Sequence, residues 1–202
     1  MSVSASRLCV GLLGLFVSVS SLAEAKSDFR FMMSLGYTGG GDKVLRASIF
    51  DVSTGNLIDE TDIKAGERYQ LNMGAYWKMS ASPISAQLTY GYHADSAGKG
   101  APDKITFGRY PIELLAHYHI NDTFFFGGGV RKATRNNLTY YVKGVKTSFR
   151  HESNTGGVVE LGWQAVPDLM FTLRAVSERY KEPVSGKSYS GKHVGLFGTY
   201  VF

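Results

Sequence analysis

The sequence predicts an all-β fold, an eight-stranded antiparallel up-and-down transmembrane β-barrel. Three observations support this prediction. Apolar and polar residues alternate with a period of two through eight segments, and the links between these segments are alternately short and long. No stretch of a dozen residues keeps the 3.6-residue apolar period of a helix. A chain of 202 residues has room for one such domain and hardly for two.

The composition excludes several classes of protein. Aromatic residues reach 13% and charged residues only 19%, which excludes a disordered chain. The single cysteine, Cys9, excludes a disulfide scaffold, a zinc cluster and the usual iron–sulfur centres, and no cofactor is expected. The formal net charge of +5 is mild and does not indicate a nucleic-acid partner.

Residues 1–25 have the three parts of a secretory signal peptide. Arg7 supplies the positive charge, and the apolar run Leu8–Val19 is too short to span a bilayer. Small residues at Ala23 and Ala25 fit the positions that a signal peptidase reads, so we expect cleavage after one of them. The mature chain, residues 26–202, then has no cysteine and no apolar run of about 18 residues.

The first four predicted strands each present one apolar row. The first row, with Arg30 and Ser34 between its members, is Phe29, Phe31, Met33, Leu35 and Tyr37. The second, across residues 68–79, is Tyr69, Leu71, Met73, Ala75, Trp77 and Met79. The third, across 85–93, is Ala86, Leu88, Tyr90 and Tyr92. The fourth, across 109–120, is Tyr110, Ile112, Leu114, Ala116, Tyr118 and Ile120.

The last four strands repeat the pattern. The fifth row, across 123–131, is Phe124, Phe126, Gly128 and Val130. The sixth is Val159, Leu161, Trp163 and Ala165, and the seventh is Leu169, Phe171, Leu173 and Ala175. The eighth is Val194, Leu196, Tyr200 and Phe202. Gly, Ser, Thr and a few charged residues fill the other face, whereas a soluble β-sandwich would carry more Lys, Glu and Asp there.

The links separate the two ends of the predicted barrel. Short links, read as periplasmic turns, fall at Ser80–Pro83, Asn121–Asp122 and Val166–Asp168. Long links, read as external loops, cover residues 38–66, 94–104, 135–154 and 181–191. Two of them contain candidate hairpins, Val44–Val52 with Leu57–Ile63, and Tyr140–Val142 with Val145–Thr147.

The chain resembles the small eight-stranded outer-membrane β-barrel proteins of Gram-negative bacteria. Its last segment, Val194–Phe202, ends on Phe and places Tyr200 and Phe202 on one face, similar to the signal that the barrel insertion machinery reads. The phrases Arg109–Leu115 and Phe126–Arg131 are similar to an uncharacterised subgroup of these barrels, for which the resemblance supplies no activity. The resemblance to outer-membrane barrels implies that the protein is located in the cell outer membrane.

Eight strands enclose a lumen that side chains can fill, and charges inside it must be paired. If Ala165 faces Leu169 across Pro167, the same register places Glu160 opposite Arg174. If Ile120 faces Phe124, Glu113 lies opposite Arg131. With Arg109 and His117 nearby, we expect a lumen ion-pair network of Glu113, Arg131, Glu160, Arg174 and Glu178.

The long links are rich in cations. We expect seven of them to face the phosphorylated lipopolysaccharide of the outer leaflet: Lys132, Arg135, Lys143, Lys146, Arg150, Lys187 and Lys192. The function expected from these features is a non-enzymatic structural or surface-interaction barrel, present as a monomer, with outer-membrane lipid and lipopolysaccharide as partners. A small pore or carrier for a small or hydrophobic solute is the alternative, because the lumen could also be wet.

A lipid A-modifying enzyme is the third hypothesis. The fragment His151–Asn154 resembles the His-x-Ser-Asn element of outer-membrane lipid A deacylases, in which His activates Ser. That family carries its motif later in the chain, and here Ser153 is expected in a loop. The histidines His117 and His119 share a face, but their pattern does not predict a metal site.

Overall fold

The computed structural model describes residues 27–50, 57–79, 81–97, 104–142 and 144–202. The predicted signal peptide and Lys143 therefore lie outside the described residues. No helix in the described ranges is long and apolar enough to cross a membrane. The strands are β1 (Ser27–Gly40), β2 (Lys43–Phe50), β3 (Leu57–Lys64), β4 (Arg68–Met79), β5 (Ile84–Ala97), β6 (Lys104–His119), β7 (Phe124–Val142), β8 (Val145–Ser153), β9 (Thr155–Val166), β10 (Leu169–Ser177), β11 (Arg179–Lys181), β12 (Ser188–Ser190) and β13 (His193–Val201).

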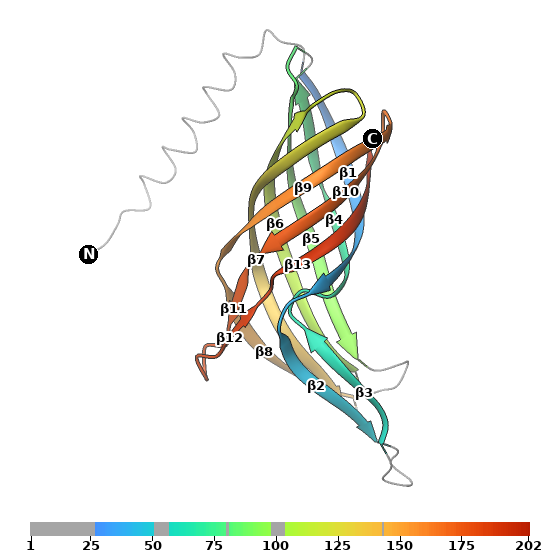
Figure 1. Ribbon diagram of the computed structural model, residues 1–202. Coiled ribbons are helices and arrows are strands. Elements are labelled where there is room, and N and C mark those ends of the chain that lie inside the picture. The colour runs from blue at the N-terminus through green and yellow to red at the C-terminus, as the bar shows by residue number, and fades with distance from the viewer. Residues whose placement is uncertain (1–26, 51–56, 80, 98–103, 143) are drawn as a thin grey trace, which may run out of the picture.

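Eight of these strands form a closed antiparallel barrel (Figure 1). Its wall follows the chain through β1, β4, β5, β6, β7, β9, β10 and β13, and β13 pairs again with β1. Each predicted apolar row lies on one of the eight, so the predicted fold class is confirmed. Closure leaves the wall without free strand edges.

The apolar rows face outward over the whole height of the wall. Large exposed side chains include Phe31, Leu35, Leu88, Leu114 and Leu161, each more than half exposed. The opposite face of every wall strand points inward and is mostly buried and polar, as Ser34 and Gln87 illustrate. An apolar outside with a polar inside suits a barrel that spans a lipid bilayer. The protein is therefore a barrel of the outer-membrane type, and its lipid-facing surface is consistent with location in the outer membrane.

The long links extend the fold at the end opposite the C-terminus (Figure 1). β2 and β3 form a separate two-stranded sheet, as the first candidate hairpin predicted, while residues 51–56 between them are not described. β7 continues beyond the wall to Val142 and pairs with β8 through Val142↔Val145, as the second candidate hairpin predicted. The expected loop 135–154 is therefore mostly strand, and Ser153 lies at the end of β8 rather than in a loop. Short strands β11 and β12 pair beside β8.

The first and last wall strands, β1 and β13, meet at a seam. Met32 pairs with Val201 and Leu35 with Gly198. Arg30 closes the seam at its short-turn end, donating from Nε to the carbonyl oxygen of Phe202 at 3.0 Å. Its Nη2 lies 2.6 Å from Asp168 in the turn between β9 and β10.

That turn corrects one predicted pairing. Leu169 pairs with Val166 rather than with Ala165, and a bulge follows between Leu169 and Met170. The bulge restores the predicted register, so that Arg174 pairs with Glu160. The prediction was right about the charged pair and wrong about the turn, because the alternation does not reveal an irregularity at Val166–Asp168.

Candidate functional site: the barrel interior and the outer wall

The barrel interior holds a network of buried charges with Glu113 at its centre. Glu113 points inward from β6 and accepts from two arginines, Arg131 on β7 and Arg174 on β10, at 2.5 and 2.8 Å. Gln70 on β4 donates to the same carboxylate at 3.0 Å. Both oxygens of a fully buried carboxylate are thus satisfied by charged or polar donors, which is the condition for keeping it ionised inside a barrel.

Arg131 joins the network to the outer part of the lumen. Its Nε lies 3.1 Å from Glu178, between β10 and β11, and its Nη1 donates to Gln70 Oε1 at 2.9 Å. Its Nη2 lies 3.2 Å from Nδ1 of His93 on β5. The arginine is fully buried, so its charge is neutralised by two glutamates rather than by water.

A second branch runs toward the short-turn end. Arg174 donates from Nε to Glu160 on β9 at 2.8 Å, and its guanidinium carbon lies 4.3 Å from the ring centre of Phe197 on β13. Glu160 also lies 2.6 Å from Nε2 of His117. The structure thus brings all five predicted network residues together, with three glutamates shared between two arginines.

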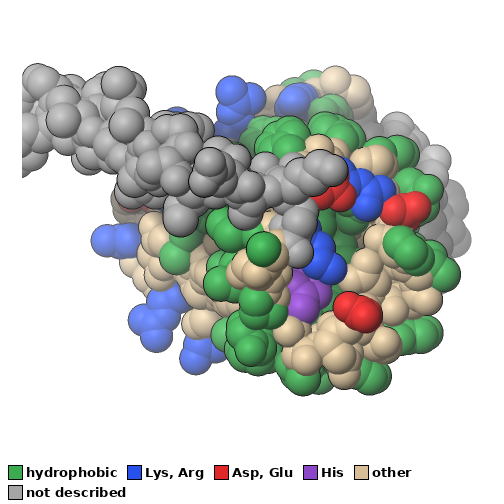
Figure 2. All heavy atoms as spheres, turned by 90° about the horizontal axis from the view of Figure 1, so that it is seen from above, with side chains coloured by type: hydrophobic (Ala, Val, Ile, Leu, Met, Phe, Trp, Pro, Cys, Tyr) green, Lys and Arg blue, Asp and Glu red, His purple; other side chains and the backbone are tan. Residues whose placement is uncertain are grey.

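Apolar layers close the lumen on both sides of the network. Toward the short turns lies a buried cluster of Met32, Tyr76, Phe125, Met170 and Val201. Toward the long links lies a larger cluster of Ile63, Ala65, Ala97, Phe107, Ala133, Leu138, Tyr180 and Tyr189. Figure 2 shows the barrel from the end that carries the C-terminus. Hydrophobic side chains lie around its outer rim, and basic and histidine side chains lie inside it. The interior is a packed core.

Arg109, expected near the network, belongs to the outer layer instead. It donates from Nη1 to the backbone carbonyl of Ala65 and packs 5.1 Å from the ring centre of Phe107. It is fully buried, and it makes no ion pair with a carboxylate in the described ranges. The alternation identified it as an inward residue but could not show that the link after β3 enters the barrel mouth to meet it.

The seven predicted lipopolysaccharide-facing cations lie on strands more often than on loops. Lys132 and Arg135 are exposed on β7, and Lys146 and Arg150 are exposed on β8. Lys187 and Lys192 are exposed in the links beside β12, whereas Lys143 is not described. Four of the six described cations therefore lie on strands rather than in loops, with Lys132 on the wall part of β7, and two lie in links.

The deacylase-like fragment does not form a catalytic pair. Ser153 Oγ donates to the carbonyl oxygen of Ala133 at 2.5 Å. His151 is buried between the rings of Phe107 and Tyr189, and its Nδ1 lies 3.3 Å from the carbonyl oxygen of Phe149. In the described part of the chain no group of three His, Cys, Asp or Glu side chains is placed to hold a metal ion.

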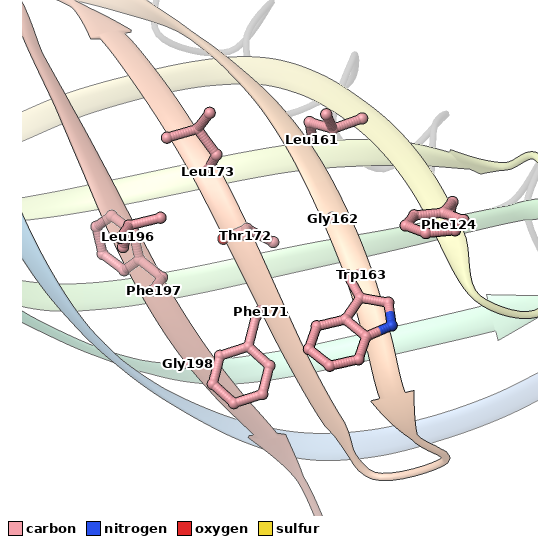
Figure 3. Close-up of a pocket in the computed structure, with 10 residues that line it drawn as sticks. All are labelled: Phe124, Leu161, Gly162, Trp163, Phe171, Thr172, Leu173, Leu196, Phe197 and Gly198. Atoms are coloured by element: carbon pink, nitrogen blue, oxygen red, sulfur yellow. The ribbon is translucent and has the colours of Figure 1, made fainter.

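The lipid-facing wall has a shallow apolar recess of about 460 Å³ on β7, β9, β10 and β13. In Figure 3 the rings of Trp163 and Phe171 lie side by side below Leu161 and Leu173, and Gly198 leaves a gap in the next strand. Trp163 and Phe171 stack with ring centres 5.8 Å apart. The surface is apolar and faces the bilayer, so it suits an acyl chain.

A second groove of about 310 Å³ lies on the same outer wall, above the lipid-facing rows. Its lining is polar and aromatic: Tyr92, Lys104, Thr106, Gly108, Tyr110, Asn137, Thr139, Tyr141 and Lys146. The two lysines come from β6 and β8, and the tyrosines come from β5, β6 and β7. Cations and aromatic rings beside hydroxyl and amide groups are suited to binding phosphorylated sugars.

No protein-family model matches the chain, and no curated protein matches it in sequence. Among solved structures it is similar to Ail, the attachment invasion locus protein of Yersinia pestis, crystallised with the heparin analogue sucrose octasulfate. The identity is 11% over 88% of this chain and 99% of that chain, with a TM-score of 0.48. Neisserial surface protein A is 10% identical over 87% and 97% of the two chains, with a TM-score of 0.45.

The outer membrane protein AlkL is 16% identical over 86% of this chain and 90% of that chain, with a TM-score of 0.39. These likenesses are too distant to assign a role. The fold rests on the strand pairing and the exposed apolar rows described above.

Sequence reasoning missed two members of the network, Gln70 and His93. Gln70 lies between Tyr69 and Leu71 of the apolar row on its strand, and this alternation is the signal that it points inward. Its position beside Glu113 depends on strands β4 and β6, which are not neighbours in the wall. Hairpin register relates only adjacent strands, so contacts across the lumen need the closed structure.

Proposed function

We propose that this protein is a non-enzymatic, non-conducting barrel of the outer membrane whose basic outer surface interacts with lipopolysaccharide. The observation that carries the first part is the packed lumen. Glu113 and Arg131 are fully buried at its centre, and apolar layers lie on both sides of them. A solute would have to break several charge-assisted hydrogen bonds to pass, which disfavours a permanent pore.

The exposed cations support the second part. Lys132 projects from the wall part of β7, Arg135, Lys146 and Arg150 project from the strand extension and the residue just before it, and Lys187 and Lys192 project from the neighbouring links. Each cation close to an anionic membrane surface contributes about 1 kcal/mol of attraction. The phosphates of lipopolysaccharide on the outer leaflet are the partner that this charge favours, and a monomer suffices because the barrel has no open strand edge.

Conductance through planar bilayers tests the closed lumen. We expect no discrete single-channel steps from the refolded protein. As a matched control, Glu113→Ala with Arg131→Ala removes two central side chains of opposite charge and should increase leakage. Steps from the unaltered protein with the size expected of a small pore would overturn the proposal in favour of the pore hypothesis.

The absence of enzymatic activity has its own test. Mass spectra of lipid A from cells with and without the expressed protein should be identical. A mass difference equal to one lost acyl chain would contradict this expectation and would restore the enzyme hypothesis. Ser153→Ala provides the control, because it removes the hydroxyl of the deacylase-like fragment while leaving the barrel wall intact.

A further inference from the structure

We propose that the groove on the outer wall of β6, β7 and β8 is a binding site for the phosphorylated sugar headgroup of a lipopolysaccharide molecule in the outer leaflet. This inference rests on the proposed function and narrows it from a basic surface to one site. The site is defined by Lys104, Thr106, Asn137, Thr139, Tyr141, Lys146 and Arg150, with Tyr92 and Tyr110 at its lower border.

Strand pairing arranges the site in three outward-facing rows. Thr139 pairs with Thr106 on one side and with Ser148 on the other, and the Thr139 and Ser148 hydroxyls lie 3.1 Å apart. Tyr141 pairs with Lys104 and with Lys146 in the row farther from the barrel. A middle row of hydroxyls therefore lies directly below a row in which two cations flank an aromatic ring.

The row nearer the barrel adds a third cation. Asn137 pairs with Gly108 and with Arg150. Gly108 has no side chain to cover this row on the β6 side. A Cβ added there would lie 3.3 Å from the ring of Tyr92. Lys146 remains exposed with its Nζ 5.7 Å from the ring centre of Tyr141, so both groups face the same space.

The site begins where the lipid-facing surface ends. Along β6 the outward residues change from Leu114 and Ile112 to Tyr110, and then to Thr106 and Lys104. The tyrosine rings of Tyr92 and Tyr110, whose centres are 5.1 Å apart, mark the boundary typical of a membrane interface. Lys104 lies six residues beyond Tyr110, about 20 Å along the strand at a rise of 3.4 Å per residue. The groove therefore lies at the level of headgroups, above the acyl chains.

The chemistry of the groove selects among the molecules at that level. Three cations within one outward patch favour a ligand with more than one phosphate. Hydroxyl and amide side chains, with an exposed tyrosine ring, fit sugar hydroxyls and the apolar face of a sugar ring. Lys104, Lys146 and Arg150 make no ion pair with a carboxylate in the described ranges, so their charges are available to a ligand.

Titration of the folded protein in detergent tests the proposal, with bound lipid counted by native mass spectrometry. The probes are lipid A carrying its inner-core sugars and both phosphates, the same molecule without phosphates, and phosphatidylglycerol. The variant Lys104→Gln/Lys146→Gln/Arg150→Gln should weaken binding of the phosphorylated probe on the order of 100-fold. This follows because each cation contributes about 1 kcal/mol and about 1.4 kcal/mol corresponds to a tenfold change in affinity. The variant Lys78→Gln/Arg179→Gln/Lys181→Gln removes the same charge at positions outside the proposed lipopolysaccharide-facing surface and should bind within about threefold of the unaltered protein.

Tyr141→Leu separates sugar recognition from charge alone. It should weaken binding of lipid A about two- to tenfold with or without phosphates, and leave phosphatidylglycerol unaffected. Heat-modifiable gel mobility checks that every variant is folded.

Each further outcome overturns a defined part of the proposal. Equal losses in the two triple variants would show diffuse attraction, which overturns the site while the proposed function stands. An unaltered protein that binds lipid A no better than phosphatidylglycerol would overturn both. Unchanged binding by Tyr141→Leu would overturn the sugar contact.

Discussion

The carboxylate of Glu113 lies 2.5 Å from Nη1 of Arg131, and neither side chain is exposed to solvent. The two residues are also directly paired across β6 and β7, so backbone register and side-chain chemistry select the same contact. A second arginine, Arg174, reaches the other oxygen of Glu113 from across the lumen. This carboxylate therefore connects strands that are not neighbours in the wall.

Replacing Glu113 should be the most destabilising single change in the network. Glu113→Gln keeps the shape of the side chain but deprives Arg131 and Arg174 of a shared negative charge, at a cost of about 3–5 kcal/mol in the free energy of unfolding. Urea unfolding in lipid vesicles, followed by tryptophan fluorescence, measures it. Thr89→Val, at a buried hydroxyl facing the lumen on β5, is the control and should cost less; an equal cost would mean that Glu113 has no special role.

Glu160 and Arg174 should be energetically coupled. Glu160→Ala leaves Arg174 with its 2.8 Å contact to Glu113, so this single loss should fall below that of Glu113→Gln. Removing both partners should cost less than the sum of the single losses, with a coupling above about 0.5 kcal/mol. A double-mutant cycle from the same unfolding measurements gives this quantity. Strictly additive losses would mean that the two side chains do not meet.

Glycines on the inner face make room for aromatic side chains. A Cβ at Gly162 would lie 2.0 Å from the ring of Phe125, whereas one at Gly157 on the same strand would meet nothing within 4 Å. Gly162→Ala should therefore lower the free energy of unfolding by about 1–3 kcal/mol through overpacking. Gly157→Ala should leave it unchanged or raise it slightly. Equal effects of the two substitutions would contradict the packing described here.

Arg30 and Phe202 should have separable roles at the seam. Arg30→Ala removes a partly exposed ion pair and two hydrogen bonds to backbone carbonyls, at a cost of at most about 1 kcal/mol, and should not slow insertion. Deleting Phe202 should slow insertion and leave periplasmic material for proteases, because Tyr200 and Phe202 form the predicted insertion signal. Pulse-chase measurement of heat-modifiable protein compares the two. Normal insertion after deletion of Phe202 would refute the signal.

Acid should weaken the strand extension around His151. Burial between Phe107 and Tyr189 lowers the pKa of this histidine, although the Phe149 carbonyl and Glu182 act in the opposite direction. The unfolded chain then binds the proton more readily, so the stability of this region is fully present above the ordinary histidine pKa of about 6.5 and is lost as the pH falls below it. The protection of β8 amides against hydrogen exchange, relative to the intrinsic exchange rate at each pH, should fall at pH 5, and His151→Gln should remove this dependence on pH.

The period-two alternation predicted which side chains face lipid and which face the lumen, because each wall strand separates two different environments. Hairpin arithmetic placed Glu113 opposite Arg131, since adjacent strands share a register. It also placed Glu160 opposite Arg174, although the bulge at Leu169 invalidated the turn pairing on which that step relied.

Contacts across the lumen could not be predicted in the same way. The approach of Gln70 to Glu113 and the contact between Arg109 and Ala65 depend on how the closed barrel is filled. Of the strand extension the sequence predicted only the tip, the hairpin of Tyr140–Val142 with Val145–Thr147, because exposed residues on both faces of β8 weaken the alternation that marks a longer strand. The outer-wall groove is formed by β6, β7 and β8 together, so no single segment of the sequence reveals it.

The seam between β1 and β13 also constrains the order of folding. Met32 and Val201 are partners although almost the whole mature chain lies between them. Loop closure over such a separation makes the final step slow, and the wall cannot be completed until β13 has been synthesised. Until then both edge strands present unpaired backbone groups. The unfinished wall therefore stays open to pairing with strands of other chains until β13 reaches β1.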